Sequence, residues 1–233
     1  MEDRLRVAVG LADMCELASA VFAFPTPELA AALSEGSIAE DLRGCLEDAG
    51  VWGEDGSPLS EVAGFASCDS AALFDSMRKG YSLLYLAPGG TTPVWPYESP
   101  FRFVADGREG EPSLFRSPRQ VDVERHMREA GVLPKDARTE PADSIWSELS
   151  FMSYLYGQVA KALHEGREAD VAEWSGRIVR FWDEHAAKWL PAFMAKTAKE
   201  APRHSFGAEY GCLAEVGSLV LGVIRNDIDS RRG

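Results

Sequence analysis

Apolar residues recur at steps of three and four along most of this chain, and this spacing limits the possible folds more than any other feature. The clearest series cover residues 5–22, 145–163, 171–182 and 210–224. Such steps place side chains on one face of an α-helix, whereas a half-buried strand alternates with a period of two. No Asn-Gly or Asp-Gly turn joins two alternating segments. The sequence therefore predicts an all-α fold, a single multi-helix domain over residues 1–233.

Capping residues mark where several of these helices begin. Residues 26–27 (Thr-Pro) and Asp69 are typical of helix starts, and residues 37–40 and 117–120 both match the capping box, in which a Ser is followed three positions later by Glu or Gln. Pro191 fits the first turn of a further helix after 171–185. For the core we expect four aromatic residues on the apolar faces, namely Trp146, Phe151, Trp182 and Phe193.

Residues 88–100 contain four prolines, two glycines and the aromatic residues Trp95 and Tyr97. This composition predicts a structured loop of extended backbone without regular helix. Trp95 and Tyr97 either offer rigid contact surfaces to a bound peptide or plug the core, and the sequence leaves both interpretations open. Residues 101–116 are charged and contain glycines, which favours a hinge there.

Acidic residues outnumber basic ones, 37 to 24, which gives a net charge of -13. Such a field repels phosphate backbones, so we expect no nucleic-acid partner. Residues 1–61 alone hold 13 acidic and 3 basic side chains. This acidic face either attracts a cationic partner or serves solubility alone.

Catalytic and metal-binding motifs are missing from the sequence. It contains no Gly-x-Ser-x-Gly, His-Glu-x-x-His, Gly-x-Gly-x-x-Gly or phosphate-binding loop motif. His126, His164, His185 and His204 lie far apart along the chain, so we expect no metal site, no cofactor and no enzymatic activity. The four cysteines are scattered, which favours reduced thiols in the cytoplasm. No export signal or membrane anchor is expected, because the apolar stretches are too short.

Three blocks of residues resemble the signature of a known family. Residues 81–88 (Tyr-Ser-Leu-Leu-Tyr-Leu-Ala-Pro) and 96–99 (Pro-Tyr-Glu-Ser) form the first block, and residues 140–152 (Glu-Pro-Ala-Asp-Ser-Ile-Trp-Ser-Glu-Leu-Ser-Phe-Met) form the second. The third consists of Phe181, His185, Trp189, Pro191 and Phe193. In this order the blocks resemble the TorD/DmsD family of cytoplasmic redox-enzyme maturation chaperones, over residues 81–221.

The resemblance implies an all-helical chaperone that binds the twin-arginine leader of a molybdopterin-containing oxidoreductase in its apo or unfolded form. Such a chaperone holds the precursor back from export and assists cofactor insertion. With a hinge at 101–116, the chain is expected to be a monomer or a domain-swapped dimer. The residues expected to bind the leader are Leu84, Tyr85, Pro93, Trp95, Pro96, Tyr97, Ser99, Glu140 and Asp143.

The chain departs from the family pattern at two places. Ser144 stands where many relatives have His after the acidic Asp143, so no ligand-binding role of that imidazole is carried over. Residues 95–100 read Trp-Pro-Tyr-Glu-Ser-Pro where several relatives have Pro-Pro-Trp-x-Ser, which suggests recognition of a different leader.

Two other functions remain open from the sequence. One is a small helical enzyme, such as a phosphohydrolase, with Asp143, His126 and His185 in its site. The other is a helical interaction module that binds a folded partner through the acidic face of residues 1–61. Asp143 itself has two possible roles, since it either binds a leader guanidinium or caps the helix that begins after Pro141.

Overall fold

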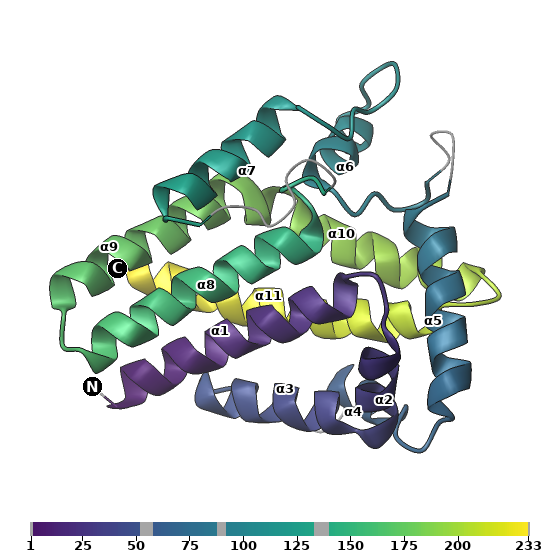
Figure 1. Cartoon of the computed structure of the whole chain (residues 1–233), viewed down its shortest axis with the longest axis horizontal. Helices are drawn as coiled ribbons and strands as arrows, with labels where there is room; N and C mark the ends of the chain where they lie inside the picture. The colour runs from purple at the N-terminus through teal and green to yellow at the C-terminus, as the bar shows by residue number, and fades with distance from the viewer. Residues whose placement is uncertain (1, 52–57, 88–91, 133–139, 233) are drawn as a thin grey trace.

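The structure is a computed structural model that describes residues 2–51, 58–87, 92–132 and 140–232 (Figure 1). Helices dominate these ranges, no strand occurs in them, and one isolated antiparallel bridge joins Tyr97 to Ser144. The all-α prediction is confirmed. The helices are α1 (Glu2–Phe22), α2 (Pro27–Glu35), α3 (Ser37–Asp48), α4 (Pro58–Ala63), α5 (Ser70–Tyr85), α6 (Glu98–Ala105), α7 (Pro118–Glu129), α8 (Ile145–His164), α9 (Glu168–Phe181), the π-helical turn η1 (Trp182–Ala186), α10 (Ala187–Glu200), the 3₁₀ turn η2 (Ala201–Arg203) and α11 (Glu209–Arg232).

Helices α1, α8 and α11 run through the middle of the view in Figure 1, where α1 packs against both α8 and α11, with α3 along one side and α7 and α9 along the other. The most extensive packing is between α1 and α8, followed by α10 with α11 and α8 with α9. Phe151, Trp182 and Phe193 are buried in this core, as predicted, whereas Trp146 is half-buried and packs at its edge.

Three of the predicted helix starts are confirmed by their capping hydrogen bonds. The side chains of Thr26, Asp69 and Ser117 each accept a hydrogen bond from the backbone N–H three residues later. The predicted capping box at 37–40 is wrong. Gly36, with a φ of 84°, ends α2 in the left-handed region and leads directly into α3, and the Ser37 hydroxyl donates to a carbonyl of α2.

Two of the predicted loops and helix boundaries need correction. The proline-rich loop was expected to extend to residue 100, but α6 begins at Glu98, because a proline in the first helical turn removes no intrahelical hydrogen bond and Pro100 lies in that turn. Residues 88–91 lie outside the described ranges. Helix α6 also occupies the first part of the expected hinge at 101–116, and residues 106–117 form an irregular connection to α7.

Pro191 does not open a helix as predicted. Helices α9 and α10 run on through η1, and Pro191 is the fifth residue of α10. Its neighbours Trp189, Leu190 and Phe193 are fully buried, so their packing keeps the helix continuous across the missing N–H.

Within the described residues, no single helix is long and apolar enough to cross a membrane. Helices α1 and α2 meet that requirement only together, as a pair bent by 120°.

Candidate functional site

The proline-rich segment and the segment that leads into α8 are joined along their backbones. Ile145 N–H donates to the Pro96 carbonyl at 3.0 Å, and Glu98 N–H donates to the Asp143 carbonyl at 2.8 Å. These bonds hold residues 92–98 in an extended path across the start of α8. The first two family blocks are therefore adjacent in space.

Asp143 caps a helix, but not the one that the sequence suggested. Its Oδ2 accepts hydrogen bonds from the Ser99 N–H at 3.0 Å and from the Ser99 hydroxyl, so it holds the first turn of α6. The cap of α8 is Ser144, whose side chain accepts from Ser147 N–H at 3.2 Å. The residue that replaces the family's His thus has a structural role of its own.

The carboxyl group of Asp143 is fully buried, and its Oδ1 has no hydrogen-bond partner among the residues that the structure describes. Burial raises the pKa of Asp143, and the neighbouring charge of Glu98 raises it further, while hydrogen bonds from Ser99 oppose the shift. Because this carboxyl group is fully buried, a leader guanidinium can reach it only if the residues around it move.

Glu98, the first residue of α6, is also fully buried, and its carboxylate contacts one residue of α6 and one of η1. One carboxylate oxygen pairs with Arg102 Nη1 at 2.5 Å, and the other lies 2.8 Å from His185 Nδ1. Glu148 of α8 accepts from the Trp189 indole N–H at 2.9 Å. Burial, with the charge of Glu98, raises the pKa of Glu148 well above its usual value.

These contacts bring the three family blocks together in one buried network. Glu98 comes from the first block, Glu148 from the second and His185 from the third, and their ligand-type atoms all lie within 4.8 Å of one another. Burying a polar group is costly unless it is hydrogen-bonded, so these bonds favour the arrangement in which the three segments meet.

The residues expected to bind a leader divide into buried and accessible groups. Five of them have almost no exposed surface, namely Leu84, Tyr85, Pro96, Ser99 and Asp143. Pro93, Trp95 and Tyr97 are half-buried, and Glu140 is exposed. All nine residues therefore lie in one region, in which the five buried residues support the four that have exposed surface. Whether they bind a leader stays a prediction.

An exposed aromatic residue that the sequence did not single out lies next to this region. Phe24, which is 49% exposed, packs edge-on against Tyr81 with ring centroids 5.2 Å apart. Burial raises the pKa of Tyr81, and Tyr97 and Glu140 lie close enough to raise it further. Burial and the charges of Glu140 and Asp143 raise the pKa of Tyr97 to about 12. Tyr81 thus packs against the exposed ring of Phe24 and lies within the electrostatic influence of Tyr97 and Glu140.

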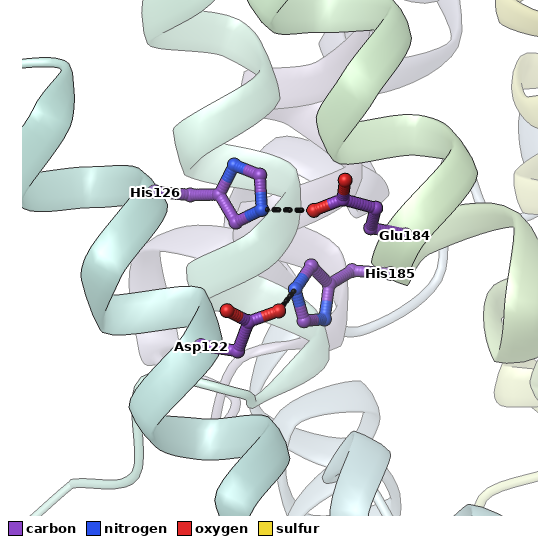
Figure 2. Close-up of side chains that lie close together, drawn as sticks. All are labelled: Asp122, His126, Glu184 and His185. Carbon is purple, nitrogen blue, oxygen red and sulfur yellow. Dashed lines mark hydrogen bonds and ion pairs between the residues drawn. The ribbon is translucent and has the colours of Figure 1, made fainter.

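A second cluster lies between α7 and η1, as Figure 2 shows. His126 Nε2 is 2.7 Å from Glu184 Oε2, and His185 Nε2 is 3.2 Å from Asp122 Oδ2. The two imidazole rings are 5.2 Å apart. Burial lowers the pKa of His126, although its hydrogen bond to Glu184 opposes the shift. The sequence analysis expected no such cluster, because its histidines come from α7 and η1, which are far apart in the chain.

Comparisons with known proteins match the part of the chain that contains the three blocks. The family described as nitrate reductase delta subunit matches residues 53–195. A protein of Thauera selenatis named selenate reductase assembly chaperone protein is 29% identical over 193 residues, which span 82% of this chain and 90% of that protein. A protein of Ideonella dechloratans named chlorate reductase assembly chaperone protein is 31% identical over 156 residues, 66% of this chain and 75% of that protein.

This chain belongs to the nitrate reductase delta subunit family. The resemblance to redox-enzyme maturation chaperones is confirmed at that level, since both relatives are named as assembly chaperones of reductases. No solved structure gives a significant match. The match ends at residue 195, so it includes all three blocks and the buried network that they form.

The enzyme alternative is not favoured by the geometry of the family's segments. His126 and His185 do meet, but the carboxylates beside them belong to Asp122, Glu184 and Glu98, and Asp143 bonds to Ser99 instead. The members of this family found by comparison are named as chaperones.

Proposed function

We propose that this chain is an assembly chaperone of a reductase, and that it binds the twin-arginine leader of a molybdopterin-containing oxidoreductase in the cytoplasm before export. The observation that carries the proposal is the pairing of accessible aromatic and acidic side chains on a rigid support. Trp95 and Tyr97 are half-exposed, Glu140 is exposed, and the segments that carry them are pinned by the buried bonds of Asp143 and Glu98.

A twin-arginine leader combines two guanidinium groups with an apolar segment. Carboxylates bind guanidinium through charge-assisted, often bidentate hydrogen bonds, for which Glu140 is the accessible candidate. Aromatic side chains held in place by a rigid backbone contribute contact area at little entropic cost, which suits Trp95 and Tyr97. The exposed ring of Phe24 extends this apolar area.

The buried members of the predicted site act as its support in this proposal. Asp143 and Ser99 fix α6 to the start of α8, and Leu84 accepts a backbone hydrogen bond from Val94 at 3.0 Å. Substituting these residues is expected to lower stability first and leader affinity only as a consequence. Substituting the accessible residues is expected to lower leader affinity while leaving stability nearly unchanged.

Titration calorimetry with the client's leader peptide tests the proposal. Trp95→Ala is expected to weaken binding by about 2 kcal/mol if it is an anchor of the interface, roughly a 30-fold loss. Glu140→Gln is expected to weaken binding of the leader and to reduce the preference for it over a Lys-Lys version of the peptide. Phe115→Ala is the matched control, because Phe115 is 48% exposed and lies in the connection before α7.

Equal affinity across these variants and both peptides contradicts leader binding at this surface. The acidic face of residues 1–61 is then the second candidate, supported by its excess of acidic side chains. Charge reversal at the exposed Glu40, Asp41 and Glu47 of α3 tests it in the same assay. Loss of binding there, with the Trp95 variant unaffected, favours an interaction module for a cationic partner.

A further inference from the structure

The cluster between α7 and η1 brings four ligand-type side chains to one point. Asp122 and His126 lie on successive turns of α7, and the neighbours Glu184 and His185 of η1 both reach toward them (Figure 2). The ligand atoms of all four lie within 4.8 Å of one another. From this geometry we propose that Asp122, His126, Glu184 and His185 form a binding site for a divalent transition-metal ion of the zinc type.

The donor set and its spacing suit such an ion. Zinc takes four ligands, commonly imidazole nitrogen and carboxylate oxygen at about 2.0–2.2 Å, which sets tetrahedral ligand atoms about 3.3 Å apart. The two hydrogen-bonded pairs here are 2.7 and 3.2 Å apart. Small side-chain rotations within the 4.8 Å cluster therefore bring all four atoms to bonding distance.

The two ring nitrogens of His185 face different carboxylates, Nδ1 that of Glu98 and Nε2 that of Asp122. His185 Nδ1 lies 2.8 Å from the buried carboxylate of Glu98, to which it donates its hydrogen. Its Nε2 lies 3.2 Å from Asp122 Oδ2, on the side of the ring that faces the cluster. A carboxylate behind a histidine is also the usual outer partner of metal-bound imidazole.

Access and burial are divided in a way that suits ion binding. The imidazole side chains are 2% and 3% exposed, whereas the carboxylates of Asp122 and Glu184 are 40% and 44% exposed. An ion can thus enter past the carboxylates and reach the nitrogens below them. The π-helical turn that carries Glu184 and His185 is a rare feature often found at functional sites.

Arg125 competes with the ion for this site. Its guanidinium donates to Asp122 Oδ1 at 2.8 Å and lies 3.3 Å from His126 Nε2 and 3.6 Å from Glu184 Oε2. The same side chain is 43% exposed and also pairs with Glu129, so it can turn away when an ion binds. The proposal therefore requires that removing the guanidinium strengthens metal binding.

A bound ion adds a link between two elements that are far apart in the chain, α7 and η1. Helix α7 follows the irregular residues 106–117, and η1 belongs to the long α9–α10 run. Because His185 also bonds to Glu98 of α6, the ion fixes α7 relative to the buried network. This role is independent of the leader-binding proposal, which concerns a different surface.

Calorimetric titration of the chelator-treated full-length protein with Zn²⁺ tests the site. A Cys68→Ser background removes the exposed thiol that competes for zinc. We expect one equivalent to bind, at least 10-fold weaker binding in the Asp122→Asn/Glu184→Gln double variant, and tighter binding in Arg125→Gln. His164→Ala is the matched control, because His164 is exposed and lies at the far end of α8.

Cobalt provides a second readout that does not depend on affinity. Co²⁺ bound by two imidazoles and two carboxylates in a tetrahedral site gives visible absorption bands, which the double variant is expected to lose and His164→Ala to keep. Absence of stoichiometric binding overturns the proposal. Unchanged binding in the double variant, whose conservative changes at half-exposed positions preserve the helical dichroism spectrum, overturns it equally.

Discussion

Asp143 offers the sharpest test of how this fold is held together. Replacing it with Ala removes the acceptor of the Ser99 N–H, a buried donor in the first turn of α6. The Ser99 hydroxyl keeps a partner in Ser117, so one backbone donor is left without a hydrogen bond. Loss of a helix cap costs about 1 kcal/mol, and an unsatisfied buried donor costs roughly 1–3 kcal/mol.

These effects are partly offset by relief of the buried carboxyl group, since burial raises its pKa. We therefore expect Asp143→Ala to lower the free energy of unfolding by about 2 kcal/mol. For a chain of this size, that lowers the melting temperature by roughly 4–8 °C. Thermal unfolding followed by far-ultraviolet dichroism measures the shift. A charged Lys at this position is expected to cost more, because it cannot be buried without a partner.

Asp69→Ala is the matched control for this measurement. Asp69 also caps a helix, α5, with an acceptor 2.8 Å from Ala72 N, but the bond is exposed. Its loss is expected to cost about 1 kcal/mol. Equal melting temperatures for the two variants would show that burial adds no cost at Asp143.

The pH dependence of stability checks the same assignment. Asp143→Asn keeps an acceptor for Ser99 but cannot ionise. Because the pKa of Asp143 is raised in the folded state, its protonation favours folding below the unfolded pKa, and this contribution is lost as the pH rises through the folded pKa. The unaltered chain is therefore expected to gain stability relative to the Asn variant as the pH falls from 7 toward 4. A flat or opposite trend contradicts the burial argument.

Three further predictions concern packing and reactivity. Gly80→Ala is expected to destabilise the chain by about 1–3 kcal/mol in urea unfolding, because the added Cβ would overlap the backbone of Gly207. Gly157 has open space around it, so Gly157→Ala is expected to stabilise α8 by up to about 1 kcal/mol. Phe193→Ala is expected to cost about 3–5 kcal/mol, since its fully buried ring contacts four other aromatic rings. Cys68 is expected to react first with a thiol reagent, because it alone of the four thiols is exposed. Mass spectrometry of the modified chain identifies the residue that reacts.

The helices of this fold could be predicted from the sequence because their signals are local. Thr26, Asp69 and Ser117 each act within three residues, so the sequence contains all that their capping requires. The start of α6 could not be found in this way. Its cap is Asp143, which lies 44 residues away from Ser99, and no local pattern reports that pairing.

The sequence suggested which residues lie near one another in the candidate region, but not which of them are exposed, and leader binding by them stays a prediction. The family blocks identified Trp95, Tyr97 and Asp143 together, and the structure brings them to one region. Burial of Asp143 depends on how two distant segments meet, which periodicity does not describe. The histidine cluster was missed for the same reason, since His126 and His185 come together only when α7 packs against η1.

We propose that this chain binds a reductase precursor through the surface of Trp95, Tyr97 and Glu140 before the precursor is exported. Quantitative mass spectrometry of the proteins that co-purify with the chain from its native cells measures this binding. We expect an oxidoreductase with its twin-arginine leader still attached to co-purify with the unaltered chain and with Phe115→Ala, and to be lost with Trp95→Ala/Glu140→Gln. Recovery of only leader-free, mature enzyme, or equal recovery with all three proteins, would contradict it.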